Sequence, residues 1–360
     1  MAWASPAPRY TTGSSLRGRD VPRLLHNPEV CDSFEETGLK GARMRRDLRQ
    51  ASFADGLVHQ RAGMNRWMDE IDKLIDWSAV VKVLDRIYDS DEGRPSYPLL
   101  TYVKLLLLQQ WYGLSDPGLE EAVDDRLSFR RFAGLPLDES VPDHSTIWRF
   151  RQELAAHGLA EALFEEINRQ LDAKGLIVRE GTLIDATLLQ ASVKPPSVKE
   201  GTVSERDPEA GWTQKNGKSH FGYKAHVAVD EGSEIIRTAI LTSADLHDSQ
   251  PAAELIQGDE HAVYGDKAYA SQGLRDRLAE AGINDGLMYR AARNKPLKPW
   301  QSWFNKAVAA IRAAVERRFG IMKRGYGFRR VRYIGLVRNS CHLHLVCTAI
   351  NLRRALALAG

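Results

Sequence analysis

The change from helix-forming to strand-forming sequence near residue 176 is the feature that most constrains the fold of this 360-residue chain. In SHFGYKAHVAVD, residues 219–230, buried-type side chains alternate with a polar face formed by His220, Lys224 and His226. This alternation is typical of a β-strand, and we expect its polar face to meet solvent or a ligand. The turn DEGSE and the apolar run IIRTAILTSA follow, so the segment predicts an antiparallel hairpin.

Two further apolar runs flank this hairpin in the sequence. GTLIDATLLQAS precedes it, and HAVYGDKAYA follows it after a short helical segment, DSQPAAELIQGD. A helical crossover returns the later strand parallel to the earlier one, with a strong preference for right-handed connections. The sequence therefore predicts a mixed α/β sheet in which the first and fourth strands can lie side by side.

Three acidic residues stand out in this region. Asp185 lies inside the first strand, where an aspartate is rarely buried without a partner. Asp266 ends the fourth strand, although Asp after Gly is also common in ordinary turns. Glu316 lies on a long predicted helix, KAVAAIRAAVERRFGIMKR. Three converging carboxylates would repel one another, and a hard divalent cation such as Mg²⁺ or Mn²⁺ would remove that penalty.

Positive charge gathers around the third acid. The net charge is only +3, yet nine Lys or Arg residues lie between Arg312 and Arg338, with Glu316 as the one acid and four aromatic residues among them. Such a stripe is typical of a nucleic-acid surface, and the alternative is a solvated basic helix face.

The chain divides by composition into three parts. Residues 1–60 predict a flexible N-terminal arm, 61–175 a helical DNA-binding domain and 176–360 the catalytic domain, with 192–218 as a surface excursion. Within the helical part, PLLTYVKLLLLQQWYG, DPGLEEAVDDRLSFRRFAGL and VPDHSTIWRFRQELAAHG each carry helix start and stop signals. They fit a helix-turn-helix module that exposes Arg149 and Arg151, or a plain helical bundle.

Several classes of protein are excluded by composition. No run of about 18 apolar residues predicts a membrane span, and the first residues lack the apolar core of a secretion signal. Three scattered cysteines do not form a zinc motif or a disulfide framework. We therefore expect a cytoplasmic protein.

Taken in order, these motifs resemble those of the IS5-family DDE transposases of bacterial insertion sequences, which belong to the wider IS4-like group. LIDATLLQASVK is similar to the first acidic motif of this family and VYGDKAYAS to the second. IRAAVERRFGIMKRGYGFRRVRYIGLVRN is similar to the third, with its trailing basic segment. The resemblance covers roughly residues 60 to 355.

The resemblance implies an RNase H-like mixed five-stranded sheet flanked by helices, with Asp185, Asp266 and Glu316 as catalytic ligands of two Mg²⁺ ions, Mn²⁺ being an alternative. The IS4 signature places Tyr, Arg, Glu and Lys at fixed spacing, and Arg312, Glu316 and Lys323 fit it, whereas Ala309 stands in the tyrosine position. Charge and resemblance together predict DNA contacts from Arg312, Lys323, Arg317, Arg318, Arg324, Arg329, Arg330, Arg149, Arg151 and Lys267.

The implied function is metal-dependent DNA cleavage at the ends of an insertion sequence, followed by strand transfer into target DNA. Its partners would be terminal inverted repeats, target DNA and further copies of the chain, in a dimer or larger assembly near the bacterial nucleoid. Two alternatives remain open at this point. One is an RNase H-like nuclease without strand transfer, and the other is a catalytically silent DNA-binding repressor derived from a transposase.

Overall fold

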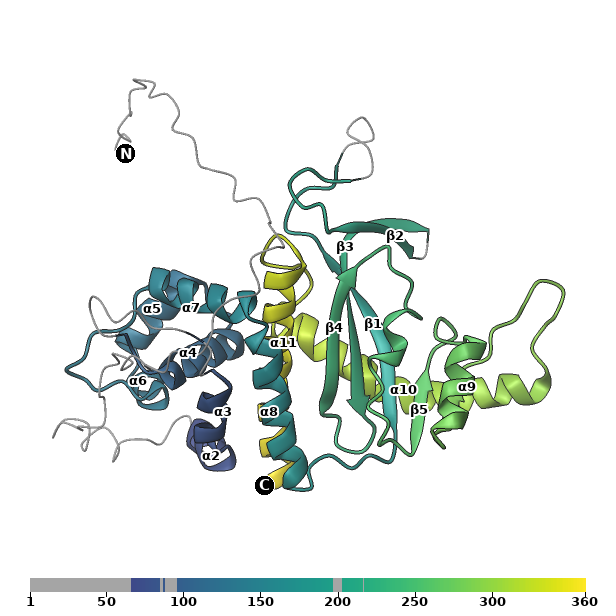
Figure 1. The fold of residues 1–360 in the computed structure, drawn as a ribbon, viewed down its shortest axis with the longest axis horizontal. Helices are drawn as coiled ribbons and strands as arrows, with labels where there is room; N and C mark the ends of the chain where they lie inside the picture. Colours follow the sequence, from purple (N-terminus) through teal and green to yellow (C-terminus); the bar gives the residue numbers. More distant parts are fainter. Residues whose placement is uncertain (1–65, 85–86, 88–95, 197–202, 216) are drawn as a thin grey trace, which may run out of the picture. The chain divides into compact units, whose positions relative to one another are not determined.

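The computed structural model describes residues 66–84, 87, 96–196, 203–215 and 217–360. The chain divides into two compact units, Met1–Ala42 and Arg43–Gly360, and every described residue belongs to the second. The arm predicted over residues 1–60 therefore lies outside the described residues. The described part runs from a group of helices into one sheet and ends in two long helices (Figure 1).

The helices that precede the sheet in the described residues are α2 (Arg66–Leu74), α3 (Trp77–Val83), α4 (Leu99–Tyr112), α5 (Asp116–Asp125), α6 (Leu127–Ala133), α7 (His144–Ala156) and α8 (Leu159–Ala173). The helix stop and start signals of the sequence coincide with observed helix ends at Gly113 and Asp143. Gly113 ends α4 in the left-handed conformation, with φ of 64°. Asp143 caps α7, since its side chain accepts the N–H of Thr146. The helix expected after Asp116 is interrupted by the extended backbone of Arg126, which separates α5 from α6.

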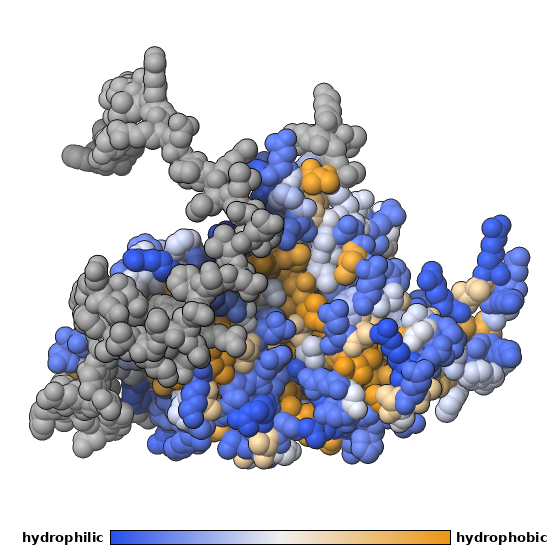
Figure 2. Space-filling model, viewed as in Figure 1, coloured by the Kyte–Doolittle hydropathy of each residue, from blue (hydrophilic) through white to orange (hydrophobic). Residues whose placement is uncertain are grey.

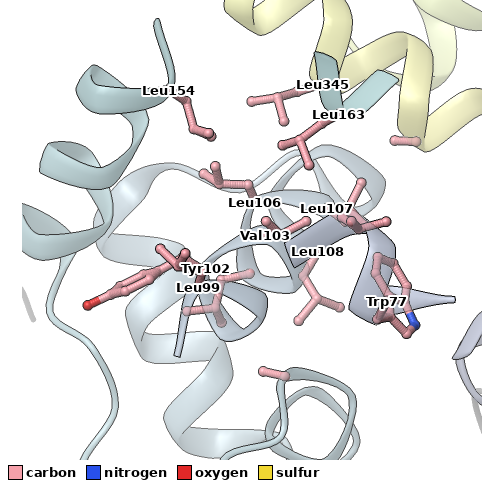
Figure 3. Packing of buried hydrophobic residues seen from close by; sticks show 14 of the residues in the cluster. Trp77, Leu99, Tyr102, Val103, Leu106, Leu107, Leu108, Leu154, Leu163 and Leu345 are labelled. Carbon is pink, nitrogen blue, oxygen red and sulfur yellow. The ribbon is translucent and has the colours of Figure 1, made fainter. Parts of the chain in front are cut away.

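Helix α4 forms the centre of the helical core. It is apolar on nearly all sides, as is typical of a helix surrounded by other elements. Figure 3 shows Val103, Leu106 and Leu107 packed among side chains from neighbouring helices, including Leu154, Leu163 and Leu345. Leu345 comes from the C-terminal helix α11 (Leu336–Ala359), so the two ends of the described chain share this core.

The sheet contains β1 (Thr182–Gln190), β2 (Gly211–Lys215), β3 (Lys218–Asp230), β4 (Ile236–Ser243), β5 (Ala262–Gly265) and β6 (Asn284–Leu287). Strand β3 pairs antiparallel with β1 on one side, while β2 and β4 pair with its successive halves on the other. Strands β1, β5 and β6 are parallel neighbours. The described strands therefore occupy five positions, antiparallel then parallel, which is the RNase H-like arrangement expected from the sequence.

Helices cover both faces of this sheet. On one face, α10 (Pro299–Gly325) and α11 pack against Leu183, Val227 and their neighbours. On the other face, α9 (Gln272–Glu280) and the short 3₁₀ helix η1 (Pro251–Ala253) pack against Ile184 and Ala228. Helix α10 is longer than the helix expected from the sequence because it begins at Pro299, in the first helical turn.

Helix α11 also links the helical core to the sheet. Its Cys341 and Leu345 belong to the helical core, and its Leu343 and Val346 belong to the core under the sheet. The boundary between a helical and a catalytic domain near residue 175 therefore remains a prediction.

On the visible part of the face in Figure 2, hydrophilic residues predominate and apolar residues appear in separate groups. No helix among the described residues has the length and apolar character that crossing a membrane requires.

Buried histidines make the stability of this fold depend on pH. Burial lowers the pKa of His342 to about 3, and its Nδ1 atom has no hydrogen-bond partner among the described residues. The unfolded chain takes up a proton below its ordinary pKa of about 6.5, whereas the folded chain does not. Stability therefore falls as the pH drops below 6.5, by about 2 kcal/mol for this residue between pH 7 and pH 5.

We expect His342→Gln to reduce the loss of unfolding free energy between pH 7 and pH 5 by about that amount. Urea unfolding at the two pH values measures it. His247→Gln, at an exposed histidine, is the matched control and should leave the pH dependence unchanged. Identical pH dependence in the parent and in His342→Gln would contradict this account.

Candidate active site

The strand pairing brings two of the three predicted acids together. Ile184 of β1 is in register with Gly265 of β5, and Asp185 and Asp266 are the next residues on these neighbouring parallel strands. Asp266 directly follows β5, and neighbouring strands lie about 5 Å apart, so the two acidic residues lie side by side. The predicted adjacency of the first and fourth strands is confirmed. Asp266 also has a local role, because its Oδ1 atom accepts the N–H of Ala268 at 2.8 Å.

Arg312 of α10 supplies positive charge to this pair. Its Nη2 atom lies 2.6 Å from Oδ2 of Asp185, and Oδ1 of Asp185 accepts the N–H of Ala186 at 2.8 Å. Both side chains of the ion pair are mostly covered, with 11% of Arg312 and 18% of Asp185 exposed. The guanidinium of Arg312 therefore pairs with one of the two carboxylate oxygens of Asp185.

The pKa of Asp185 reflects this surrounding. Burial raises it to about 6, and the nearby charge of Asp266 acts in the same direction. Arg312 and the N–H of Ala186 act in the opposite direction and keep the rise within this limit. Asp185 is thus ionised at neutral pH but takes up a proton just below it.

Glu316 is placed differently. It is exposed on α10, one helical turn beyond Arg312, and its carboxylate makes no ion pair within the described residues. One turn corresponds to a rise of about 6 Å along the helix. Among the described residues, no three His, Cys, Asp or Glu side chains form a group that could hold a metal ion. The structure thus brings two residues of the predicted set together and leaves the third on the exposed surface of α10, outside that pair.

One polar residue near the two acids, Tyr269, was not singled out by sequence reasoning. Tyr269 is fully buried three residues after Asp266, and its hydroxyl has no hydrogen-bond partner in the described part of the chain. Burial raises the pKa of Tyr269, and the charges of Asp185, Asp248 and Asp266 add to this effect. Lys224 lies 2.8 Å from Asp248. The hydroxyl of Tyr269 is therefore near enough to these three carboxylates for their charge to act on its pKa.

His226 does not face solvent as its strand pattern suggested. It is fully buried, and its Nε2 atom lies 2.9 Å from the hydroxyl of Thr242. Burial lowers its pKa to about 4. The polar face of β3 is covered because α9 and η1 pack on that side of the sheet, and a single strand pattern carries no sign of that second layer.

Six of the predicted DNA contacts lie on the surface of the protein. Five of these exposed residues are Arg149, Lys267, Arg324, Arg329 and Arg330. Arg317 is also largely exposed, although it pairs with Glu234 at 2.6 Å. Lys323 is partly buried, and its pKa is lowered by burial and by the neighbouring charges of Lys215 and Arg329.

Two arginines expected on the DNA-binding surface are buried instead. Arg151 pairs with Asp116 at 2.6 Å and also contacts the hydroxyl of Tyr333. Arg318 pairs with Glu234, whose carboxylate it shares with Arg317. Both buried guanidinium groups pair with partly buried acids, because a buried charge requires a counter-charge. The exposed basic surface therefore excludes them.

Comparison with known families matches two regions of the chain. Residues 177–352 match the family described as "Transposase DDE domain". Residues 58–153 match the family described as "Transposase domain (DUF772)". The first match spans the sheet with α9, α10 and most of α11, and it contains Asp185, Asp266 and Glu316.

Two solved structures illustrate the comparison by fold. The piggyBac transposase synaptic complex with hairpin DNA is 9% identical, with a TM-score of 0.42, over 84% of this chain and 75% of that one. The Mos1 strand transfer complex is 10% identical, with a TM-score of 0.18, over 78% of this chain and 83% of that one. At these scores the likenesses add nothing to what the strand order already shows.

The Arg312–Asp185 pair gives a direct test of the site's electrostatics. In Arg312→Gln the neutral amide no longer stabilises the carboxylate, so the pKa of Asp185 should rise from about 6 to ~7 or above. NMR titration of ¹³C-labelled aspartate carboxyl groups measures it. Arg317→Gln removes an exposed arginine of the same helix and should leave the value unchanged. An unaltered pKa in Arg312→Gln would show that the guanidinium does not balance Asp185.

Proposed function

We propose that this chain is a DDE transposase that cuts DNA at the ends of a mobile element and joins those ends to target DNA. The observation that carries the proposal is the meeting of Asp185 and Asp266 on neighbouring strands beneath α10, within the region that matches the transposase DDE domain. The finer assignment to the IS5 family rests on the motifs and spacing of the sequence.

The proposed metal ligands are Asp185, Asp266 and Glu316. Transposase DDE domains generally use divalent metal ions. The donor set suits such an ion, because carboxylate oxygens are the preferred ligands of Mg²⁺ and Mn²⁺. Asp185 and Asp266 are already neighbours, and the carboxylate of Glu316 is exposed one helical turn from Arg312. Two bound ions would activate a water or 3′-hydroxyl and stabilise the leaving oxygen of the phosphodiester.

The residues of the chain itself set the charge of this site. At neutral pH Asp185 is ionised, and Arg312 carries the compensating charge within the protein. A guanidinium pairs as readily with a phosphate as with a carboxylate, so Arg312 is also suited to hold a backbone phosphate beside the acids. Lys323, two further turns beyond Glu316 on α10, is proposed for a second phosphate.

The proposed DNA-binding surface consists of the exposed cations Arg149, Lys267, Arg324, Arg329 and Arg330, together with Lys323 and Arg317. Arg149 lies with the exposed Trp148 on the outer face of α7, which supports a role for this helix in binding terminal repeats. Bringing two DNA ends together requires at least two active sites, and we therefore propose a dimer or larger assembly on DNA. Its proposed location is the bacterial cytoplasm, with the nucleoid.

The catalytic assignment is tested by neutral isosteres of the three acids. Asp185→Asn, Asp266→Asn and Glu316→Gln should each lower metal-dependent cleavage of DNA carrying element ends by at least ~100-fold, because each removes a ligand charge. Asp276→Asn, at an exposed aspartate of α9, is the control and should cleave like the parent. Full cleavage by Glu316→Gln alone would remove Glu316 from the ligand set.

The same assay separates the alternative functions. Pre-cleaved ends should become joined to a plasmid by the parent protein. A nuclease without strand transfer would cut but not join, and a silent repressor would bind the ends without cutting them.

The exposed cations are tested through the salt dependence of DNA binding. The double variant Arg324→Ala with Arg329→Ala should bind DNA more weakly and reduce the slope of log K against log salt concentration by about 2, since each phosphate contact releases about one counterion. Fluorescence anisotropy over a range of salt concentrations measures this slope. Lys174→Ala, at an exposed lysine after α8, serves as the control. An unchanged slope in the double variant would exclude these arginines from the interface.

A further inference from the structure

A cavity of about 430 Å³ opens at the carboxyl end of β1. Figure 1 shows β2 beside the beginning of β3 at this end of the sheet. The lining of the cavity combines aromatic and other ring side chains with cationic ones. It includes Lys194, Pro195, Trp212, His220, Phe221 and Arg330. This cavity lies outside the acidic pair described above.

The walls of the cavity are fixed by the fold. The backbone around Arg330 runs along the end of β1, since Gln190 donates to the carbonyl of Arg329 at 3.1 Å and Val331 donates to the carbonyl of Gln190 at 2.9 Å. The guanidinium of Arg330 donates to the carbonyl of Ala191 at 2.9 Å. The trailing basic segment is therefore tied to the strand that carries Asp185.

The ring of Trp212 forms the aromatic wall. It is partly exposed and lies 5.2 Å, centroid to centroid, from the buried ring of Phe221. One ring thus supports the other and leaves part of the indole uncovered. An aromatic ring held in this way is suited to stack on a planar group.

Three cations that do not line the cavity are connected to its walls along the chain, since Arg329 precedes Arg330 and Lys215 lies on the same strand as Trp212. Lys323 and Arg329 come from the end of α10 and the segment after it, and Lys215 comes from β2. They lie close enough for Lys215 and Arg329 to lower the pKa of Lys323. Within the described residues, none of the three forms an ion pair with an acid. Three neighbouring cations without acidic partners, together with a polar–aromatic cavity, suit a ligand that has a planar group and carries phosphates.

We propose that this cavity takes the base of one unpaired nucleotide, from a DNA strand whose phosphates lie on Lys215, Lys323 and Arg329. The proposal rests on the proposed function, because it takes DNA as the substrate. A base can enter a cavity and stack on an aromatic side chain when it is unpaired, as in single-stranded DNA. The cavity therefore fits a short single-stranded overhang rather than a blunt duplex end.

The distance to the acids sets the length of that overhang. Gln190 at the cavity lies five positions beyond Asp185 on β1, which is ~16 Å along an extended strand. This equals about five steps of stacked DNA at ~3.4 Å each. An overhang of about five nucleotides beside the reacting phosphodiester would thus reach Trp212.

The experiment compares DNA ends that differ only in the overhang. Fluorescence anisotropy with labelled duplexes should show that the full chain binds an end with five unpaired nucleotides on the order of tenfold more tightly than a blunt end. Trp212→Ala should lose this preference, and Lys194→Ala, at an exposed residue of the same cavity, should reduce it. Trp303→Ala, at a tryptophan that is 71% exposed elsewhere on the protein, should keep it.

Each outcome decides one question. A parent that binds blunt and overhanging ends equally, or a Trp212→Ala variant that retains the full preference, overturns the cavity's assignment and leaves the proposed function standing. A parent that binds neither kind of end overturns the proposed function itself. Quenching of Trp212 fluorescence by the overhang but not by the blunt end, compared with Trp212→Ala, would support the stacking contact directly.

Discussion

The buried charge of Asp185 is the constraint on which the arrangement of this site depends. A carboxylate in the middle of a strand covered on both faces requires a counter-charge, and α10 supplies it through Arg312. This pair, together with the apolar contacts of Val315 and Phe319, fixes where α10 crosses the sheet. Glu316 and Lys323 occupy their positions as a consequence.

The same pair defines what a divalent cation would meet. One oxygen of Asp185 is bonded to Arg312, and Asp266 stands on the next strand with part of its carboxylate engaged in its own turn. A cation between the two acids competes with the guanidinium for the charge of Asp185. On the proposed function, a DNA phosphate would offer Arg312 an alternative partner, so metal and DNA would each favour the binding of the other at this site.

The sequence predicted those elements whose periodicity is local. Strands β1, β3, β4 and β5 and the ends of α4 follow from alternation, turn residues and caps, and the adjacency of Asp185 and Asp266 followed from topology. Helix α11 was not predicted because it is apolar on nearly every side and also buries polar residues such as His344 and Asn351. The partners of these residues lie far away in the sequence: Asn351 bonds to Asn168 and to Ile236. Strand β6, with the short polar sequence NDGL, carries no strand pattern.

The basic stripe between Arg312 and Arg338 shows why the positions of the charges in the sequence could not identify which cations are exposed. In the sequence, Arg312, Arg317 and Arg318 are equivalent members of one run, but helical geometry turns successive residues by about 100°, so they point to different surroundings. Arg312 meets Asp185, Arg318 meets a glutamate 84 positions earlier, and Arg317 shares that glutamate from the surface. Conversely, Lys215 joins Lys323 although more than 100 residues separate them. A cation is more available to DNA where no acid of the fold is paired with it, and such an acid is identified by tertiary contacts rather than by position in the sequence.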